Sequence, residues 1–177
     1  KSLVPQKTSL ATVYRLLHQY DLMDRSPKPE DRRRFEASCP NDIWQSDVMH
    51  GPKVMVNQKR RKTYLIAFID DHSRLICHLQ WYLDETAEVL VHGLCQALQK
   101  RQLPRALMTD NGAAMVADEF TEGLLSLGII HEKTLPYSPY QNGKQERLWA
   151  TMEGRLMEML DGVELTLDFL NEATQAW

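Results

Sequence analysis

The chain has 177 residues, of which 43% are hydrophobic and 25% are charged. These proportions are ordinary for a globular protein with one good core, and no apolar run approaches the roughly 20 residues that span a bilayer. The chain does not begin with methionine and shows no signal peptide. We therefore expect a piece of a longer protein, in a soluble compartment and without a membrane partner.

The net charge of −3 is unevenly distributed along the chain. Residues 1–64 contain 13 Lys and Arg against 7 Asp and Glu, whereas residues 65–177 contain 8 against 17. This split predicts a basic arm beside an acidic domain, and chance clustering on a solvated surface is the alternative. The cysteines and histidines lack metal-ligand spacing, so the sequence predicts no structural zinc site.

The first predicted element is a short amphipathic helix in residues 9–22, with Ser9 as its N-cap. Residues 25–41 follow, with three prolines and the run Arg32-Arg33-Arg34. This composition is typical of a linker that carries a basic patch.

Strand patterns begin at residues 42–50, where side chains alternate and Asp47 shares a face with Ile43. Residues 53–83 indicate strand segments broken by turns. The clearest pair is Thr63–Ile69 and Leu75–Leu83, joined by the turn Asp-Asp-His-Ser. Asp84 is the predicted cap of a helix that runs to about residue 101.

The second half alternates between strands and helices. A short buried strand ends before Asp110, a helix over residues 117–128 stops at Gly128, and another strand covers residues 129–133. The predicted inward residues of that helix are Phe120, Leu124 and Leu127. After a loop, a long helix carries a core stripe of Leu148, Met152, Leu156, Met159 and Leu160. This order of elements predicts an α/β fold with a mixed sheet.

Three carboxylates stand at positions that secondary structure alone does not explain. Asp47 lies inside a strand, where aspartate is disfavoured. Asp110 ends a buried strand, at the sheet edge where α/β proteins usually place a site. Glu146 begins the firm part of a helix behind a loop rich in proline, amides and tyrosine. Parallel pairing of the strand that contains Asp47 with the strand that ends before Asp110 would bring these two side chains together. A helix packed on the sheet would add Glu146.

Carboxylates that converge without a cation repel one another, and their pKa values rise. The pattern therefore predicts Mg²⁺ with Mn²⁺ as a substitute, because both prefer oxygen ligands. Two such ions about 4 Å apart activate a water or 3′-hydroxyl and stabilise the leaving oxygen of a phosphoryl displacement. Each acid also has an ordinary alternative, a turn for Asp110 and an exposed helical side chain for Glu146. A hairpin turn explains Asp70 and Asp71 better than metal binding.

Four ordered motifs resemble the catalytic core of retroviral-type integrases and bacterial insertion-sequence transposases. They are WQSD at residues 44–47, IDDHSR at 69–74, TDNG at 109–112 and PYSPYQNGKQER at 136–147. The 35 residues between Asp110 and Glu146 match the family's D,D-35-E spacing. The helix at residues 9–22 resembles the last helix of a bacterial helix-turn-helix, and no His/His/Cys/Cys module precedes the core. These two features favour a bacterial origin over a retroviral one.

The resemblance implies a ribonuclease-H-like fold, with a mixed sheet of about five strands flanked by helices. Asp47, Asp110 and Glu146 become the catalytic and metal-binding triad. The implied activity is metal-dependent DNA 3′-end cleavage followed by strand transfer, a polynucleotidyl transferase reaction. The partners are double-stranded DNA, as element ends and as target, and further copies of the chain in a homo-oligomer. The implied location is the bacterial cytoplasm, in association with the nucleoid.

The same reading divides the chain into four parts. Residues 1–24 are a remnant of an upstream helix-turn-helix, and residues 25–41 are the basic linker. Residues 42–163 form the catalytic core, and residues 164–177 begin a further helix.

Predicted DNA contacts lie around the glutamate and on one basic strand. They are Lys144, Arg147, Asn142, Tyr140, Arg60, Arg61 and Lys62. Solvated helix charges and an ordinary exposed turn are the alternatives for the basic residues. Many relatives have a basic residue two turns after the glutamate, where this chain has Glu153.

Two other functions stay open at this point. One is a DNA-binding or assembly module that keeps the fold without the chemistry, and the complete triad speaks against it. The other is a metal-dependent nuclease of the same fold that cuts without joining, and product analysis separates it from a transferase.

Overall fold

The computed structural model describes residues 9–20, 36–134 and 143–177. The chain divides into two units, Lys1–Arg34 and Phe35–Trp177. In the first unit, helix α1 spans Leu10–Gln19, and the Ser9 hydroxyl accepts a hydrogen bond of 3.2 Å from the Thr12 backbone N–H. The predicted N-cap is therefore confirmed. None of the α1 residues is buried.

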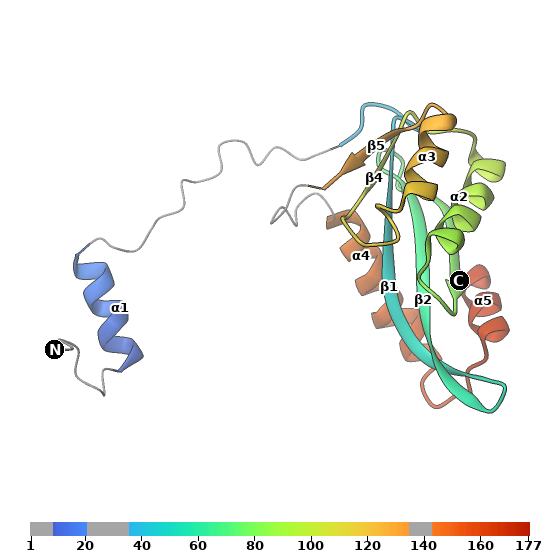
Figure 1. The fold of residues 1–177 in the computed structure, drawn as a ribbon. Helices are drawn as coiled ribbons and strands as arrows, with labels where there is room; N and C mark the ends of the chain where they lie inside the picture. Colours follow the sequence, from blue (N-terminus) through green and yellow to red (C-terminus); the bar gives the residue numbers. More distant parts are fainter. Residues whose placement is uncertain (1–8, 21–35, 135–142) are drawn as a thin grey trace. The chain divides into compact units, whose positions relative to one another are not determined.

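A five-stranded sheet forms the centre of the second unit (Figure 1). Its strands are β1 Ile43–Val56, β2 Lys59–Asp70, β3 Ile76–Tyr82, β4 Ala106–Thr109 and β5 Ile130–Lys133. Across the sheet the order is β3-β2-β1-β4-β5. The pairs β1–β2 and β2–β3 are antiparallel, whereas β1–β4 and β4–β5 are parallel. The mixed sheet predicted from the sequence is confirmed.

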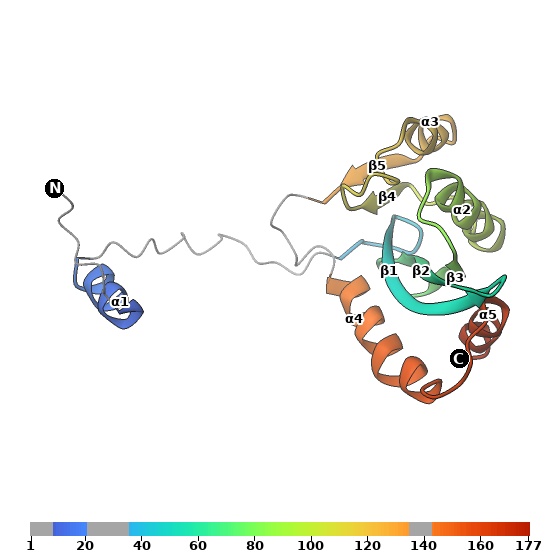
Figure 2. The same ribbon diagram turned by 60° about the horizontal axis from the view of Figure 1, so that its bottom comes forward.

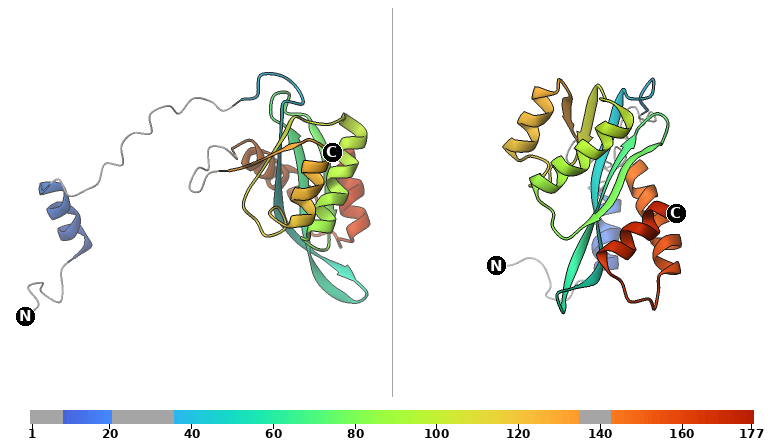
Figure 3. Two further views of the ribbon diagram at one scale, coloured as in Figure 1. Left: turned by 45° about the horizontal axis from the view of Figure 1, so that its top comes forward. Right: turned by 90° about the vertical axis from the view of Figure 1, so that its right-hand side faces the viewer.

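Helices cover both faces of this sheet (Figures 2 and 3). Helices α2, Ala87–Arg101, and α3, Asp118–Ser126, pack over one face. The other face holds α4, Gly143–Thr151, which continues as the π-helix η2, Met152–Met157, and then α5, Leu167–Ala176. The alternation of β1 explains the two cores, because Trp44 points into the α2–α3 side and Met49 into the α4–α5 side.

The β1–β2 hairpin is longer than the sequence pattern indicated. Both strands run without a break to the turn at Asn57 and Gln58, whose φ angles are 48° and 63°. Two residues with positive φ suit a two-residue hairpin turn. The register shifts between His50 and Lys53. At Gly51, within this shift, an added Cβ would lie 2.0 Å from a ring carbon of Trp81, so only glycine fits there.

Three details of the helices differ from the predictions. The cap of α2 is Thr86, whose hydroxyl accepts from the Val89 N–H, rather than Asp84. Leu127 is 48% exposed because it follows the last turn of α3, where the chain reverses at Gly128. Met159 is 74% exposed, since the π-helix rotates the following side chains relative to a regular α-helix.

Helix α5 is attached to the edge strand β3 through polar side chains. The Trp81 backbone N–H donates to Asn171 Oδ1 at 2.8 Å, and its indole Nε1 donates to Thr174 Oγ1 at 2.8 Å. Residues 164–177 therefore contain a helix that packs on the sheet.

Candidate active site

Strands β1 and β4 bring the first two carboxylates to one place. They pair in parallel with Trp44 opposite Leu107 and Gln45 opposite Met108. Asp47 and Asp110 each lie two residues beyond the last pair of this ladder, and the two side chains are close enough for the charge of Asp110 to act on Asp47. The predicted parallel pairing of the two strands is thus confirmed.

Asp47 is half-buried, and both of its carboxylate oxygens accept hydrogen bonds. Oδ2 accepts from Trp149 Nε1 at 2.9 Å, and Oδ1 accepts from the Val48 N–H at 2.8 Å. Burial raises the pKa of Asp47, these two hydrogen bonds oppose the rise, and the charges of Asp110 and Glu146 add to it. The three carboxylates therefore share one electrostatic environment.

Asp110 is held by the turn that follows it. Its Oδ1 accepts a hydrogen bond of 2.9 Å from the Gly112 N–H, an arrangement typical of aspartate in turns. The Thr109 hydroxyl donates to the Asp110 carbonyl at 2.9 Å and lies 2.9 Å from His131 Nε2. Because the hydroxyl has one proton to give, Nε2 of His131 is the donor in the second contact. The sequence reading missed His131, which carries no local motif.

Helix α4 supplies Glu146 from its first turn. The preceding residue, Gln145, is fully buried, and its Nε2 donates to the backbone carbonyl of Gln45 at 3.0 Å. Glu146 itself is exposed. One turn of helix therefore combines an anchor on β1 with a carboxylate that faces outward from the packed core.

Asp70 and Asp71 do form the predicted turn, but their side chains are also buried. Asp70 accepts hydrogen bonds of 2.6 to 2.7 Å from the Asn41 N–H and from the N–H and hydroxyl of Ser73. Burial alone would raise the pKa of Asp70, yet these hydrogen bonds bring it below its ordinary value. Asp71 is fully buried and binds three other segments. A surface turn does not account for such burial.

The donor chemistry at Asp47, Asp110 and Glu146 fits a divalent cation. In residues 9–20, 36–134 and 143–177, no three His, Cys, Asp or Glu side chains, these three acids included, are placed so that they could hold a metal ion. Burial is the main cause of the raised pKa of Asp47, and the charges of Asp110 and Glu146 add a smaller repulsion, which a cation would reverse. Carboxylate oxygens are the ligands that Mg²⁺ and Mn²⁺ prefer.

The predicted DNA contacts occupy different environments. Arg60, Arg61 and Lys62 are exposed on β2, and Arg61 forms an ion pair of 2.7 Å with Asp84. Arg147 is exposed on α4, whereas Lys144 is directed to Asp71. Tyr140 and Asn142 lie outside the described residues.

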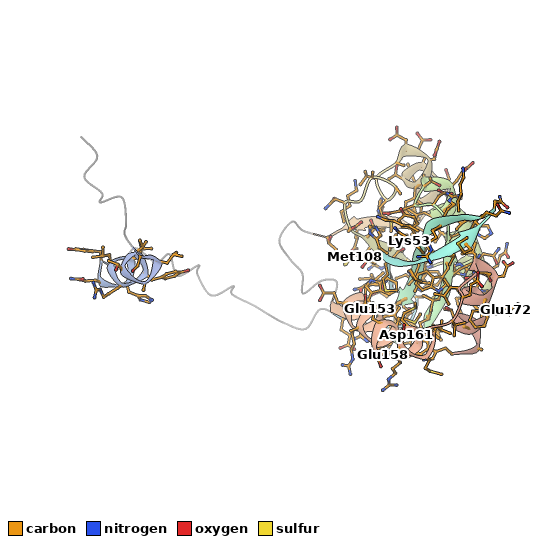
Figure 4. The ribbon with its side chains drawn as sticks, turned by 90° about the horizontal axis from the view of Figure 1, so that it is seen from below. Lys53, Met108, Glu153, Glu158, Asp161 and Glu172 are labelled. Atoms are coloured by element: carbon orange, nitrogen blue, oxygen red, sulfur yellow. The ribbon has the colours of Figure 1, made fainter. Side chains whose placement is uncertain are left out.

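Beyond the site, the outer side of the α4–η2 helix carries both acidic and basic side chains. Figure 4 shows Glu153 and Glu158 along this helix and Asp161 just after it. Glu153 and Glu158 are exposed. Arg155 lies between them and is exposed as well, so Glu153, where the resemblance predicts a basic residue, has a basic neighbour in the sequence.

Comparison with known proteins identifies the family. The family model described as "Integrase core domain" matches residues 37–139. The chain belongs to the integrase core domain family. With this assignment, the mixed five-stranded sheet flanked by helices is the ribonuclease-H-like fold of integrase catalytic cores.

Two relatives of this integrase core are parts of much longer polyproteins. The Gag-Pro-Pol polyprotein of human T-cell leukemia virus 3 (strain 2026ND) is 36% identical over 109 residues, which are 62% of this chain and 7% of that protein. The retrovirus-related Pol polyprotein from transposon TNT 1-94 of Nicotiana tabacum is 36% identical over 137 residues, 76% of this chain and 10% of that protein. The chain thus spans at most a tenth of these relatives.

Solved structures show the same architecture. The HTLV-2 integrase catalytic core domain in complex with magnesium, in its trimeric form, has a TM-score of 0.63 and 27% identity, covering 80% of this chain and 84% of that one. The simian T-cell lymphotropic virus intasome in complex with the PP2A regulatory subunit B56 gamma has a TM-score of 0.67 and 25% identity, covering 81% of this chain and 49% of that one.

Among the described residues, no helix of the integrase core has the length and apolar character to cross a bilayer.

Proposed function

We propose that this chain is the catalytic core of a DNA transposase or integrase, which cleaves DNA to free 3′ ends and joins them to target DNA. One observation carries the proposal. Asp47 and Asp110 come from neighbouring parallel strands, and burial, followed by the charges of Asp110 and Glu146, raises the pKa of Asp47. Membership of the integrase core family gives this arrangement its chemical context.

Asp47, Asp110 and Glu146 would hold Mg²⁺, with Mn²⁺ as a substitute and two ions in the full site. Bound ions would supply an activated water or 3′-hydroxyl and a counter-charge for the leaving oxygen. The magnesium in the related HTLV-2 core supports the choice of metal.

The chain's own residues prepare the site for this role. Trp149 and Val48 hold the Asp47 carboxylate through both oxygens, so its orientation is fixed before any ligand arrives. Gly112 does the same for one oxygen of Asp110. Because a Cβ at Gly112 would lie 3.0 Å from Asp110 Oδ1, a larger residue there would crowd the carboxylate.

The substrate in this proposal is double-stranded DNA. Arg147 beside the site and Arg60, Arg61 and Lys62 on β2 are the proposed phosphate contacts, since their side chains are exposed. Tyr140, Asn142 and Lys144 stay predictions from the sequence. The trimeric and dimeric forms of the HTLV-2 core support a homo-oligomer.

The domain boundaries and the origin also belong to the proposal. Residues 1–24 would be the remnant of a helix-turn-helix, 25–41 a linker, 42–163 the core and 164–177 the start of a further helical region. A bacterial insertion-sequence origin, and with it a place in the bacterial cytoplasm near the nucleoid, stays a prediction from the sequence, which the resemblance of the first helix favours. The relatives named above come from retroviruses and a plant transposon.

A reversal assay on a branched oligonucleotide tests the activity, because it demands little recognition of a specific end. We expect resealed product with Mg²⁺ or Mn²⁺, none with EDTA and none with Glu146→Gln. Glu158→Gln, an exposed acid on the same helix, should behave as wild type. Cutting without resealing would favour a nuclease, and no reaction together with no metal binding would favour a silent module.

A further inference from the structure

We propose that Asp71 is a positioning residue that fixes the first turn of α4, and with it Glu146, through a buried ion pair with Lys144. The inference rests on the proposed function in one respect, the role of Glu146 as a metal ligand. It also assigns Lys144 a structural role in place of the DNA contact predicted from the sequence.

Asp71 joins three segments that are distant in the sequence. Its fully buried carboxylate accepts hydrogen bonds from the Ala37 N–H at 2.6 Å, from Gln45 Nε2 at 2.8 Å and from Lys144 Nζ. These donors belong to the segment that enters the core, to strand β1 and to helix α4. Such a carboxylate has the partners that a buried charge requires.

Lys144 is enclosed as well. Its side chain is 16% exposed, and Nζ donates both to the Asp71 carboxylate and, at 3.2 Å, to the Asp71 backbone carbonyl. A DNA phosphate would have to compete with a buried carboxylate for this ammonium group. Loss of either partner would leave an uncompensated charge in the interior, which is strongly destabilising.

The next residue closes the same network. Gln145 Nε2 donates to the Gln45 carbonyl, and Gln45 Nε2 donates to Asp71. The two residues before Glu146 are therefore both tied to the β1–Asp71 region. This leaves little freedom for Glu146, whose charge acts on Asp47. A partner of this kind usually changes metal affinity when it is removed.

Four variants of the 177-residue chain test this role. Asp71→Asn and Lys144→Met each break the ion pair, and the double variant removes both charges. Arg147→Met is the matched control, a basic residue of the same helix turn that is exposed. The measurements are amide hydrogen exchange of residues 143–151, Mn²⁺ affinity by calorimetry, and the salt dependence of binding to a DNA duplex.

We expect both single variants to exchange faster in residues 143–151 and to bind Mn²⁺ about 10-fold more weakly. The double variant should recover part of the protection, because it has no unpaired buried charge. It also provides the test if a single variant fails to fold. DNA binding should keep its salt slope in Asp71→Asn and Lys144→Met, whereas Arg147→Met should reduce the slope by about 1.

Unchanged exchange and unchanged Mn²⁺ affinity in Asp71→Asn would overturn the positioning role. A salt slope reduced by about 1 in Lys144→Met would overturn it as well, since Lys144 would then contact phosphate. A wild-type chain that binds no Mn²⁺ would refute the proposed function. The ion pair would still be tested in that case, because hydrogen exchange measures its effect on residues 143–151 without any metal.

Discussion

The indole Nε1 of Trp149 donates a 2.9 Å hydrogen bond to Oδ2 of Asp47, so helix α4 holds the carboxylate of strand β1 directly. The same helix carries Glu146 three residues earlier. Two of the three acids in the candidate site are thus positioned by one rigid element. Whatever shifts α4 changes both Glu146 and the orientation of Asp47.

Trp149→Phe should keep the aromatic packing and remove only this hydrogen bond. Because the bond favours the charged carboxylate, its loss should raise the pKa of Asp47 further. Removal of one hydrogen bond to a charged group costs about 1.5–3 kcal/mol of folding stability. We expect a loss of stability in the lower part of this range, because Asp47 is only half-buried. Carbon-13 NMR titration of the Asp47 carboxyl measures the pKa. A pKa identical to that of wild type would show that the bond is unimportant in solution.

Asp47→Asn should change the stability of the metal-free protein at neutral pH by less than about 1.5 kcal/mol, because two effects oppose each other. The substitution removes a partly buried charge that Asp110 and Glu146 repel. It also loses one hydrogen bond, since both Asp47 oxygens accept from N–H groups and the amide nitrogen of asparagine cannot accept. Urea unfolding without metal gives the free energy. Destabilisation by more than about 3 kcal/mol would contradict the proposed repulsion, because nothing would then offset the lost hydrogen bond.

The pH dependence of the wild type follows from the same shift. The folded-state pKa of Asp47 is raised above 3.8, so the folded protein binds this proton more tightly than the unfolded chain. Protonated Asp47 therefore contributes to the stability of the folded state at low pH. This contribution is lost as pH rises from about 4 through the folded-state pKa of Asp47. Asp47→Asn should lack this contribution, which a pH series of urea unfolding experiments measures.

Gly51→Ala should destabilise the fold by about 3 kcal/mol, in the range of core overpacking. The new methyl would lie 2.0 Å from the Trp81 ring and 2.7 Å from Thr63 Oγ1. Gly123→Ala is the control, because an added Cβ there meets nothing within 4 Å and α3 should gain about 1 kcal/mol. Thermal unfolding separates the two. Equal melting temperatures would mean that the hairpin moves away from Trp81 without cost.

Arg60→Ala and Arg61→Ala should weaken DNA binding unequally. Arg60 is exposed on β2, whereas Arg61 is already paired with Asp84 at 2.7 Å. We expect Arg60→Ala to reduce the salt slope of DNA binding by about 1, and Arg61→Ala to reduce it by less. Fluorescence anisotropy at several salt concentrations measures both slopes. Two unchanged slopes would exclude this strand from the DNA interface.

The place of the carboxylates was predictable because it depends on local signals. Asp47 interrupts a strand pattern, and Asp110 follows a buried strand, so parallel pairing of the two strands was enough to bring them together. The length of the β1–β2 hairpin was not predictable in the same way. Lys59 to Lys62 project beyond the packed sheet, where no buried face imposes alternation.

Other features depend on contacts between distant residues. The exposure of Met159 follows from a π-helix, which hydrophobic periodicity does not reveal. The ion pair between Asp71 and Lys144 joins residues 73 positions apart. Each residue alone has a simpler reading, a turn acid and a solvated helix charge, and only the folded chain brings them together.

The most direct test of the account is Mn²⁺ binding by the wild type, Asp110→Asn and Glu146→Gln, followed by calorimetry or electron paramagnetic resonance. Glu153→Gln is the control, since Glu153 is an exposed acid on the same helical segment (Figure 4). We predict saturable binding by the wild type and by Glu153→Gln, and at least about 10-fold weaker binding by the other two variants. Equal affinity in all four proteins would show that Asp110 and Glu146 do not share one metal site.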